Sequence, residues 1–371
     1  MSRSLAILQV LPALDSGGVE RGTLEIAEAI QAAGYRAIVA SAGGRLVAEL
    51  EALGARHITL PLATKSPFGI WRNAAHLAEL ARLEDVGLIH ARSRAPAWSA
   101  LFAARRRGIP FVTTYHGTYG EGWPGKRLYN SIMARGDRVI AISRHIADHI
   151  KATHGAVAGE IRVILRGVDP RRFDPASVDP DRVAGFRKAW SLREGAPTVL
   201  LPARLTRWKG QAVLIEALRD LPEVVAVLAG DMRGRERYVQ EMWALAAAHG
   251  VADRLRFAGH VSDMPAAMLA ADLVIHASTE PEAFGRTVTE AQAMARPVIA
   301  ADLGGPRETV QDGVTGWLTP PGDAGMLAAL IRRVLAMPAE DRVRIGEAAR
   351  AKVPTMDAMQ AATLAVYREL L

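Results

Sequence analysis

The sequence predicts an α/β protein built on two doubly wound parallel sheets. Short apolar runs typical of buried strands alternate with helical patterns from one end of the chain to the other. The 371 residues are too many for one ordinary core, and hydrophobic residues make up 50% of them, enough to fill two cores. A stretch rich in proline and aspartate, residues 166–180, interrupts the alternation and is the expected hinge.

Ten apolar runs account for the expected strands. They are residues 5–10, 37–40, 88–90, 111–114, 138–141, 199–201, 224–229, 255–258, 273–276 and 298–300. Since helical patterns separate these runs, we expect parallel pairing through crossover helices. The domains are expected at residues 1–170 and 171–353, followed by a last helix at 354–371.

The amino-acid composition limits the chemistry and the cellular location that can be expected of this protein. The chain has no cysteine, which excludes disulfides, a thiolate nucleophile and zinc–thiolate sites and suits a reducing cytoplasm. The first apolar run holds about six residues, too few for the apolar region of a signal peptide or for the roughly 20 residues of a membrane span. No other run approaches that length. The sequence therefore predicts a cytoplasmic protein that is soluble or peripheral on a membrane.

The excess positive charge lies in the N-terminal half. Residues 1–170 hold 21 Lys and Arg against 14 Asp and Glu, whereas residues 171–371 hold 25 of each. A basic surface attracts nucleic acid or anionic lipid. Binding of single-stranded nucleic acid uses aromatic residues along a basic groove, but aromatics are only 5% of this chain, so nucleic acid is not an expected partner.

Three arginines at residues 105–107 follow Trp98, Leu101 and Phe102. Two structures fit this pattern. One is an amphipathic helix whose basic end lies on an anionic membrane. The other is a crossover helix whose apolar stripe packs in the core and whose terminal cations suit the helix dipole. We expect the aromatics to pack in the core, and attraction of the charge to a membrane stays open.

The most informative segment is residues 280–290, EPEAFGRTVTE, where an apolar strand gives way to a helix that ends before Pro297. Free N–H groups at the start of such a helix favour an anionic ligand at the carboxyl end of a parallel sheet. Glu282 and Glu290 are two-oxygen acceptors for sugar and ribose hydroxyls. The alternative is that both are solvated charges at a helix start.

A second strand-to-turn segment carries Arg204 and Lys209, five residues apart, before a helical pattern at 212–218. Across such a turn both cations converge on one ligand and neutralise the charge that develops on a departing diphosphate. The alternative is that they are solvated loop charges.

A third segment, near the N-terminus, places Gly17 and Gly18 between the strand 5–10 and a helix expected at 23–33. A glycine pair lets the backbone approach a ligand closely. This segment lacks the GxGxxG dinucleotide fingerprint, and GxxxxGK[ST] occurs nowhere in the chain. The alternative is an ordinary tight turn.

Taken together, these segments resemble the retaining glycosyltransferase family 4. The resemblance rests on residues 17–20 (GGVE), on Arg204 with Lys209, on Glu282 and Glu290 in a Glu-x7-Glu setting, and on residues 313–318 (GVTGWL). It covers nearly the entire chain and implies the GT-B fold, in which two Rossmann-like domains face a central cleft. It also implies an acceptor-binding N-terminal domain, a nucleotide-sugar-binding C-terminal domain, and a last helix that crosses back to the first domain.

The resemblance assigns a role to each candidate residue. The catalytic candidates are His116, facing the reacting sugar, Arg204 and Lys209, binding the donor diphosphate, and Glu282, lying at the sugar. The donor-binding candidates are Gly17 and Gly18 at the phosphates, His260 and Val261 at the base, the backbone amides of Phe284 and Gly285, and Glu290 at the ribose. Ala203 replaces the family's usual glycine and residues 231–233 (DMR) replace a glycine-rich loop, departures that bear on base and sugar preference.

The resemblance implies a hexosyltransferase that retains anomeric configuration and moves sugar from a nucleoside-diphosphate sugar to a hydroxyl. We expect no cofactor and no metal, because Arg204 and Lys209 supply the charge; Asp179-Pro180-Asp181 matches a metal-binding Asp-x-Asp pattern but falls in the expected linker. The expected acceptor is a glycan or lipid-linked molecule in lipopolysaccharide or other cell-envelope synthesis. The alternatives are a nucleoside-diphosphate-sugar epimerase, a soluble-acceptor transferase similar to glycogen or sucrose-phosphate synthase, and a basic nucleic-acid-binding protein.

Overall fold

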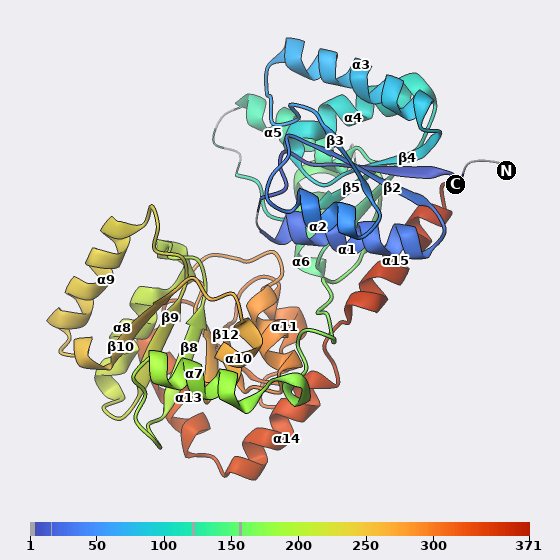
Figure 1. The fold of residues 1–371 in the computed structure, drawn as a ribbon. Helices are drawn as coiled ribbons and strands as arrows, with labels where there is room; N and C mark the ends of the chain where they lie inside the picture. Colours follow the sequence, from blue (N-terminus) through green and yellow to red (C-terminus); the bar gives the residue numbers. More distant parts are fainter. Residues whose placement is uncertain (1–3, 16, 121, 123, 156–157) are drawn as a thin grey trace. The chain divides into compact units, whose positions relative to one another are not determined.

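The computed structural model describes residues 4–15, 17–120, 122, 124–155 and 158–371 (Figure 1). The chain forms two compact units. The N-terminal unit comprises residues 1–166 and 356–371, and the C-terminal unit comprises residues 167–355. Within the described ranges, no helix is both long and apolar enough to cross a membrane.

The N-terminal unit is built on a seven-stranded parallel sheet in the order β3-β2-β1-β4-β5-β6-β7. Its strands are β1 (Ala6–Val10), β2 (Arg36–Ser41), β3 (Arg56–Thr59), β4 (Val86–Ala91), β5 (Phe111–Tyr115), β6 (Arg138–Ala141) and β7 (Glu160–Val163). The strand order reverses between β1 and β4. Ligands of such sheets bind beyond the carboxyl ends of the strands at this reversal.

Helices cover both faces of this sheet. They are α1 (Gly18–Ala32), α2 (Val47–Ala52), α3 (Pro67–Leu83), α4 (Arg94–Arg107), α5 (Pro124–Ser131), α6 (Arg144–His154) and α15 (Met356–Arg368). Figure 1 shows α3 and α4 over one face and α1, α2 and α15 over the other. Since helices cover both faces, the central strands β1 and β5 are buried at every residue and do not alternate between buried and exposed positions.

The last helix, α15, belongs to the N-terminal unit. Gln360 Nε2 donates a hydrogen bond of 2.7 Å to the carbonyl oxygen of Glu25 in α1. Tyr367 is fully buried, and its hydroxyl lies 2.6 Å from Nδ1 of His90 in β4. This helix therefore completes the core on one face of the first sheet.

The C-terminal unit repeats the same winding in a six-stranded parallel sheet of order β10-β9-β8-β11-β12-β13. Its strands are β8 (Thr198–Pro202), β9 (Val225–Ala229), β10 (Leu255–Gly259), β11 (Leu273–His276), β12 (Val298–Ala301) and β13 (Trp317–Thr319). Its helices are α7 (Pro180–Ala189), α8 (Gln211–Ala217), α9 (Glu236–Ala248), α10 (Met264–Leu269), α11 (Arg286–Ala293), α12 (Pro306–Thr309), α13 (Ala324–Ala336) and α14 (Ala339–Arg350). Apolar residues of α8, α9 and α13 fill one face, and those of α7, α10 and α11 fill the other.

The predicted fold class, two doubly wound parallel sheets, is confirmed, and all ten predicted strands are present. Three strands, β3, β7 and β13, were not predicted. The first two are edge strands of partly exposed residues with charged side chains, and the third has only three residues, so none forms a long apolar run. Helix α1 begins at Gly18 instead of residue 23.

Helix α4 differs from the expected core stripe. Leu101 is buried, but the side chain of Phe102 is 48% exposed and Trp98 is only partly buried. The rings of Trp98 and Phe102 contact each other, with centroids 5.9 Å apart, on the outer side of the helix. The prediction that these aromatics pack in the core is therefore wrong for Phe102, because alanines of α4 supply much of its inward face.

Candidate active site

A buried group of four side chains lies at the carboxyl ends of β8 and β11 in the C-terminal unit. Glu282 Oε1 accepts hydrogen bonds from Ser278 Oγ at 2.6 Å and from His276 Nε2 at 2.8 Å, and it forms an ion pair with Lys209 Nζ. His276 is the last residue of β11, and Lys209 ends the short helical turn after β8. We call these residues the Glu282 group.

All three contacts in this group reach the same oxygen of Glu282. Among the residues that the structure describes, no hydrogen bond is formed by the second oxygen, Oε2. The carboxylate is thus held by one oxygen, and the other has no hydrogen bond to the described residues; an ionised carboxylate oxygen only accepts hydrogen bonds.

Burial and charge oppose each other in the Glu282 group. The side chains of Lys209 and Glu282 are 13% and 11% exposed. Burial opposes ionisation of Glu282, but the hydrogen bond and charge of His276, together with Lys209, lower its pKa well below the ordinary value. Burial also lowers the pKa of Lys209, and the attraction of Glu282 offsets part of that effect. Near neutral pH the carboxylate is therefore ionised and paired.

Glycines bring the turns of this site together. Gly210, just after Lys209, has a φ of 74°, and a Cβ there would lie 1.8 Å from the carbonyl oxygen of Ala277. The turn after β8 can therefore pack against the end of β11 only with glycine at this position. On the other side, Gly305 N donates to the carbonyl oxygen of Glu282 at 2.8 Å, which fixes the backbone of that residue.

Arg204 and Lys209 approach the same indole ring. Lys209 Nζ lies 4.2 Å from the ring centroid of Trp208, and the Arg204 guanidinium carbon lies 6.0 Å from it. The charge of Arg204 also acts on Lys209, lowering its pKa. Arg204 is exposed, and Gln211 Nε2 donates to its carbonyl oxygen at 2.9 Å. The structure thus gathers Arg204, Lys209 and Glu282 around one turn.

Helix α11 carries the other candidates of residues 284–290. Its N-terminal residue follows Gly285, whose φ is 86°, and no side chain caps its first turn. Phe284 and Gly285 are both buried. Glu290, 16% exposed, pairs with Arg286 Nε at 3.5 Å one turn earlier in the helix.

His260 and Val261 follow β10, at the far edge of the sheet from β11. His260 is exposed, and Val261 packs against the core of the unit. Among the residues that the structure describes, neither forms a hydrogen bond with the Glu282 group or packs with it in an apolar cluster.

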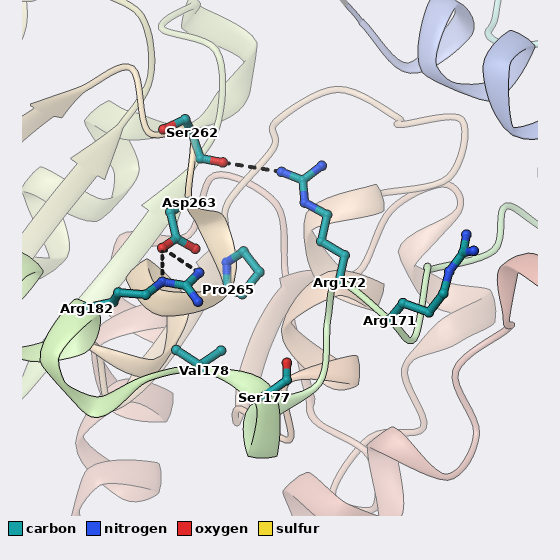
Figure 2. A pocket seen from close by; sticks show the side chains of 8 residues that line it. All are labelled: Arg171, Arg172, Ser177, Val178, Arg182, Ser262, Asp263 and Pro265. Atoms are coloured by element: carbon teal, nitrogen blue, oxygen red, sulfur yellow. Dashed lines mark hydrogen bonds and ion pairs between the residues drawn. The ribbon is translucent and has the colours of Figure 1, made fainter. Parts of the chain in front are cut away.

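A pocket of about 570 Å³ adjoins this segment, and none of the Glu282 group lines it. Figure 2 shows Arg172 pointing to the carbonyl oxygen of Ser262, at 3.3 Å, and Arg182 pairing with Asp263 at 2.7 Å. The other lining residues are Arg171, Ser177, Val178 and Pro265.

The remaining candidates lie in the N-terminal unit. Gly17, with a φ of 137°, precedes α1, and the carbonyl oxygen of Gly18 accepts a hydrogen bond of 2.7 Å from Arg166 Nη2. His116 follows β5, and its Nε2 has no hydrogen-bond partner in the described structure. Burial and the charges of Arg92 and Arg166 lower the pKa of His116 well below its ordinary value, so its ring is neutral near pH 7.

Sequence reasoning missed several polar residues that the structure places at these sites. His276 and Ser278 hold Glu282, yet His276 ends an apolar strand, and a polar residue at that position was the available signal. Arg92 and Arg166 are also polar residues that follow the ends of strands, β4 and β7 respectively. Asp179, in the Asp-x-Asp pattern, instead caps α7 by accepting from Asp181 N at 2.9 Å.

Comparison with known proteins agrees with this architecture. Residues 16–172 match the family model described as Glycosyltransferase Family 4, and residues 184–352 match the model described as Glycosyl transferases group 1. A D-inositol 3-phosphate glycosyltransferase from Xylanimonas cellulosilytica is 32% identical over 322 residues, which cover 81% of this chain and 75% of that protein. Other curated relatives are matched over smaller shares of their length, such as 47% and 56%.

Two solved structures are similar over nearly their whole length. A glycosyltransferase from Rickettsia africae ESF-5 has a TM-score of 0.91 and 36% identity, covering 99% of this chain and 98% of that one. HepE of Anabaena, solved in complex with UDP and glucose, has a TM-score of 0.86 and 27% identity, covering 99% of this chain and 100% of that one. The chain therefore belongs to the GT-B glycosyltransferases, with a family 4 domain in its N-terminal half and a group 1 domain in its C-terminal half.

Proposed function

We propose that this glycosyltransferase moves a hexose-like unit from a nucleoside-diphosphate sugar to an acceptor hydroxyl with retention of anomeric configuration. The observation that carries the proposal is the Glu282 group, in which a buried lysine and a half-free carboxylate lie together beside Arg204. A diphosphate needs fixed cations, and a sugar needs acceptors for its hydroxyls. This turn supplies both.

The hard step is departure of the nucleoside diphosphate. The bond between the anomeric carbon and the phosphate oxygen breaks as the acceptor oxygen bonds to the same face of that carbon, and the leaving phosphate takes the proton of the acceptor hydroxyl. Arg204 and Lys209 bind the phosphate more strongly as its charge grows, which lowers the barrier. Lys209 has three N–H donors, so it can hold Glu282 and a phosphate oxygen at once. No protein nucleophile and no metal are assigned.

The other candidates have proposed roles in binding the donor. Glu282 Oε2 accepts from a sugar hydroxyl, and Glu290 accepts from the ribose. The backbone amides of Phe284 and Gly285, at the uncapped start of α11, bind the donor, and His260 and Val261 hold the base. In the N-terminal unit, Gly17 and Gly18 approach the phosphates and His116 faces the reacting sugar.

The proposed acceptor is a glycan or lipid-linked molecule of the cell envelope, glycosylated at the cytoplasmic face of the membrane, as in lipopolysaccharide synthesis. A soluble acceptor is the second candidate. It is favoured by the similarity to the D-inositol 3-phosphate glycosyltransferase from Xylanimonas cellulosilytica.

Peripheral contact with an anionic membrane fits the start of α3 better than the end of α4. Phe68 and Trp71 are 69% and 67% exposed, and Lys65 and Arg72 beside them are exposed cations. Exposed aromatics flanked by cations are typical of surfaces that lie at the membrane interface. The net charge of +7 adds long-range attraction.

Replacing Trp71 with serine is expected to reduce co-sedimentation with phosphatidylglycerol vesicles several-fold, because it removes apolar area that enters the interface. Added salt should weaken the remaining binding. Trp243→Ser, at a partly exposed tryptophan of the C-terminal unit, is the matched control. Equal vesicle binding by the wild type and Trp71→Ser would remove this membrane surface from the proposal.

Calorimetric titration with UDP, GDP and ADP tests the donor. We expect one of the three to bind preferentially, and the sugar nucleotides of that base to be hydrolysed slowly without acceptor. NMR of the first sugar released from an α-linked donor should show the α anomer. Absence of binding by all three nucleotides would reject the donor class, and release of the β anomer would reject retention.

A further inference from the structure

The N-terminal unit contains a buried arginine without a counter-ion. Arg92 follows β4, next to the reversal of strand order, and is only 3% exposed. Its Nε is buried with no hydrogen-bond partner, and in the described part of the chain no carboxylate forms an ion pair with its guanidinium. A guanidinium stays charged in proteins, so burying it unpaired is costly unless an anion binds there.

The groups around Arg92 do not supply that anion. Glu25 pairs with Arg166 at 3.6 Å, and its charge acts on Arg92 without an ion pair between them. Beneath it, His90 is satisfied on both ring nitrogens, by Tyr367 at 2.6 Å and by Thr114 at 2.7 Å. Among the described residues, Glu25 is thus paired with Arg166, and Arg92 has no ion pair with a carboxylate.

His116 and Arg166 border the cluster. His116 is partly exposed, is close enough to Arg92 and Arg166 for their charges to lower its pKa, and has an unpartnered Nε2. Arg166 donates to the carbonyl oxygen of Gly18, and a Cβ on Gly22 would lie 2.5 Å from its guanidinium. The glycine at position 22 therefore lets Arg166 lie against the first turns of α1.

From this geometry we infer that Arg92 binds a negatively charged group, phosphate or carboxylate, on the acceptor. The inference rests on the proposed function, in which the donor diphosphate already has Arg204 and Lys209 as its cations in the C-terminal unit. The guanidinium of Arg92, which has no ion pair, is then not needed as a cation for the donor. It selects acceptors that carry an anion, and His116 lies close enough to Arg92 for that charge to lower its pKa.

The experiment titrates inorganic phosphate into the full chain saturated with UDP, so that the diphosphate site is occupied. We expect the wild type to bind phosphate and Arg92→Met to bind it about 10- to 100-fold more weakly, as for loss of a hydrogen bond to a charged group. Arg92→Lys should fall between them, since it keeps the charge without the planar fork. Arg106→Met, at an exposed arginine on α4, is the control and should match the wild type.

Two further readouts separate ligand binding from a structural role. Without phosphate, Arg92→Met should keep or raise the Tm, because it removes an unpaired buried charge, whereas a structural arginine would lower it. Glucose 6-phosphate and glucuronate, titrated in place of phosphate, distinguish the two anions. We expect at least one to bind more tightly than glucose in the wild type but not in Arg92→Met.

Equal phosphate binding by the wild type and Arg92→Met, or no phosphate binding by the UDP-saturated wild type, would overturn the inference. If Arg92→Met does not fold, the phosphate affinities of Arg92→Lys and the wild type are compared instead, and equal affinities would overturn the inference. UDP binding and donor hydrolysis are measured in the same samples. If they persist while the phosphate result fails, only the acceptor inference is rejected and the proposed function stands.

Discussion

Replacing Lys209 with methionine is expected to lower kcat for sugar transfer by about 10²- to 10³-fold, the usual cost of losing one fixed donor to a developing negative charge. UDP affinity should also fall, by about 10- to 100-fold, because a hydrogen bond to a charged group is lost. The reason is structural. Lys209 is the buried cation of the Glu282 group, 13% exposed, and Trp208 and Gly210 hold it in place.

Steady-state kinetics and calorimetry with UDP measure both effects. Arg207→Met is the matched control, since Arg207 lies two residues away, is 77% exposed and pairs with Glu241 on the surface. That control should change kcat less than about twofold, because an exposed pair contributes little. Lys209→Met with normal kcat and normal UDP affinity would show that the diphosphate lies elsewhere.

Replacing Glu282 with glutamine is expected to separate sugar transfer from nucleotide binding. The amide keeps the shape of the carboxylate but is a weaker, uncharged acceptor for a sugar hydroxyl, so kcat/KM should fall about 10- to 100-fold. UDP affinity should change less than about threefold, because the proposed contact is to the sugar.

Steady-state kinetics with the donor measure kcat/KM, and titration with UDP measures the nucleotide affinity. Glu280→Gln, at an exposed glutamate two residues earlier, is the control for loss of one negative charge from the same turn. Thermal unfolding of both variants shows whether Lys209, left without its partner, destabilises the C-terminal unit. Full transfer activity in Glu282→Gln would mean that the assigned role is wrong.

The sequence was sufficient for the fold class because parallel strands buried on both faces leave strong local signals. Strands such as β1 and β11 are mostly apolar runs between helical patterns, so their existence could be predicted almost to the residue. The edge strands β3 and β7 are stabilised by a neighbour on one side only and tolerate charged residues. Their pairing depends on tertiary structure, which local pattern does not report.

The candidate site could be predicted only in part, for a similar reason. Lys209 and Glu282 belong to recognisable motifs, and the structure places them in contact although 73 positions separate them. His276 and Ser278 have no motif of their own, and they matter because one carboxylate oxygen lies between them. Arg92 likewise belongs to no sequence motif. Only the structure reveals that its side chain is buried and that its Nε has no hydrogen-bond partner.

The return of α15 to the N-terminal unit has a consequence for biosynthesis. Tyr367 and His90, which meet inside that unit, are 277 positions apart, so the first sheet lacks part of its packing until α15 has left the ribosome. The C-terminal unit is continuous in sequence and is complete earlier, at residue 355. The half of the protein that is translated first is therefore the half that finishes folding last.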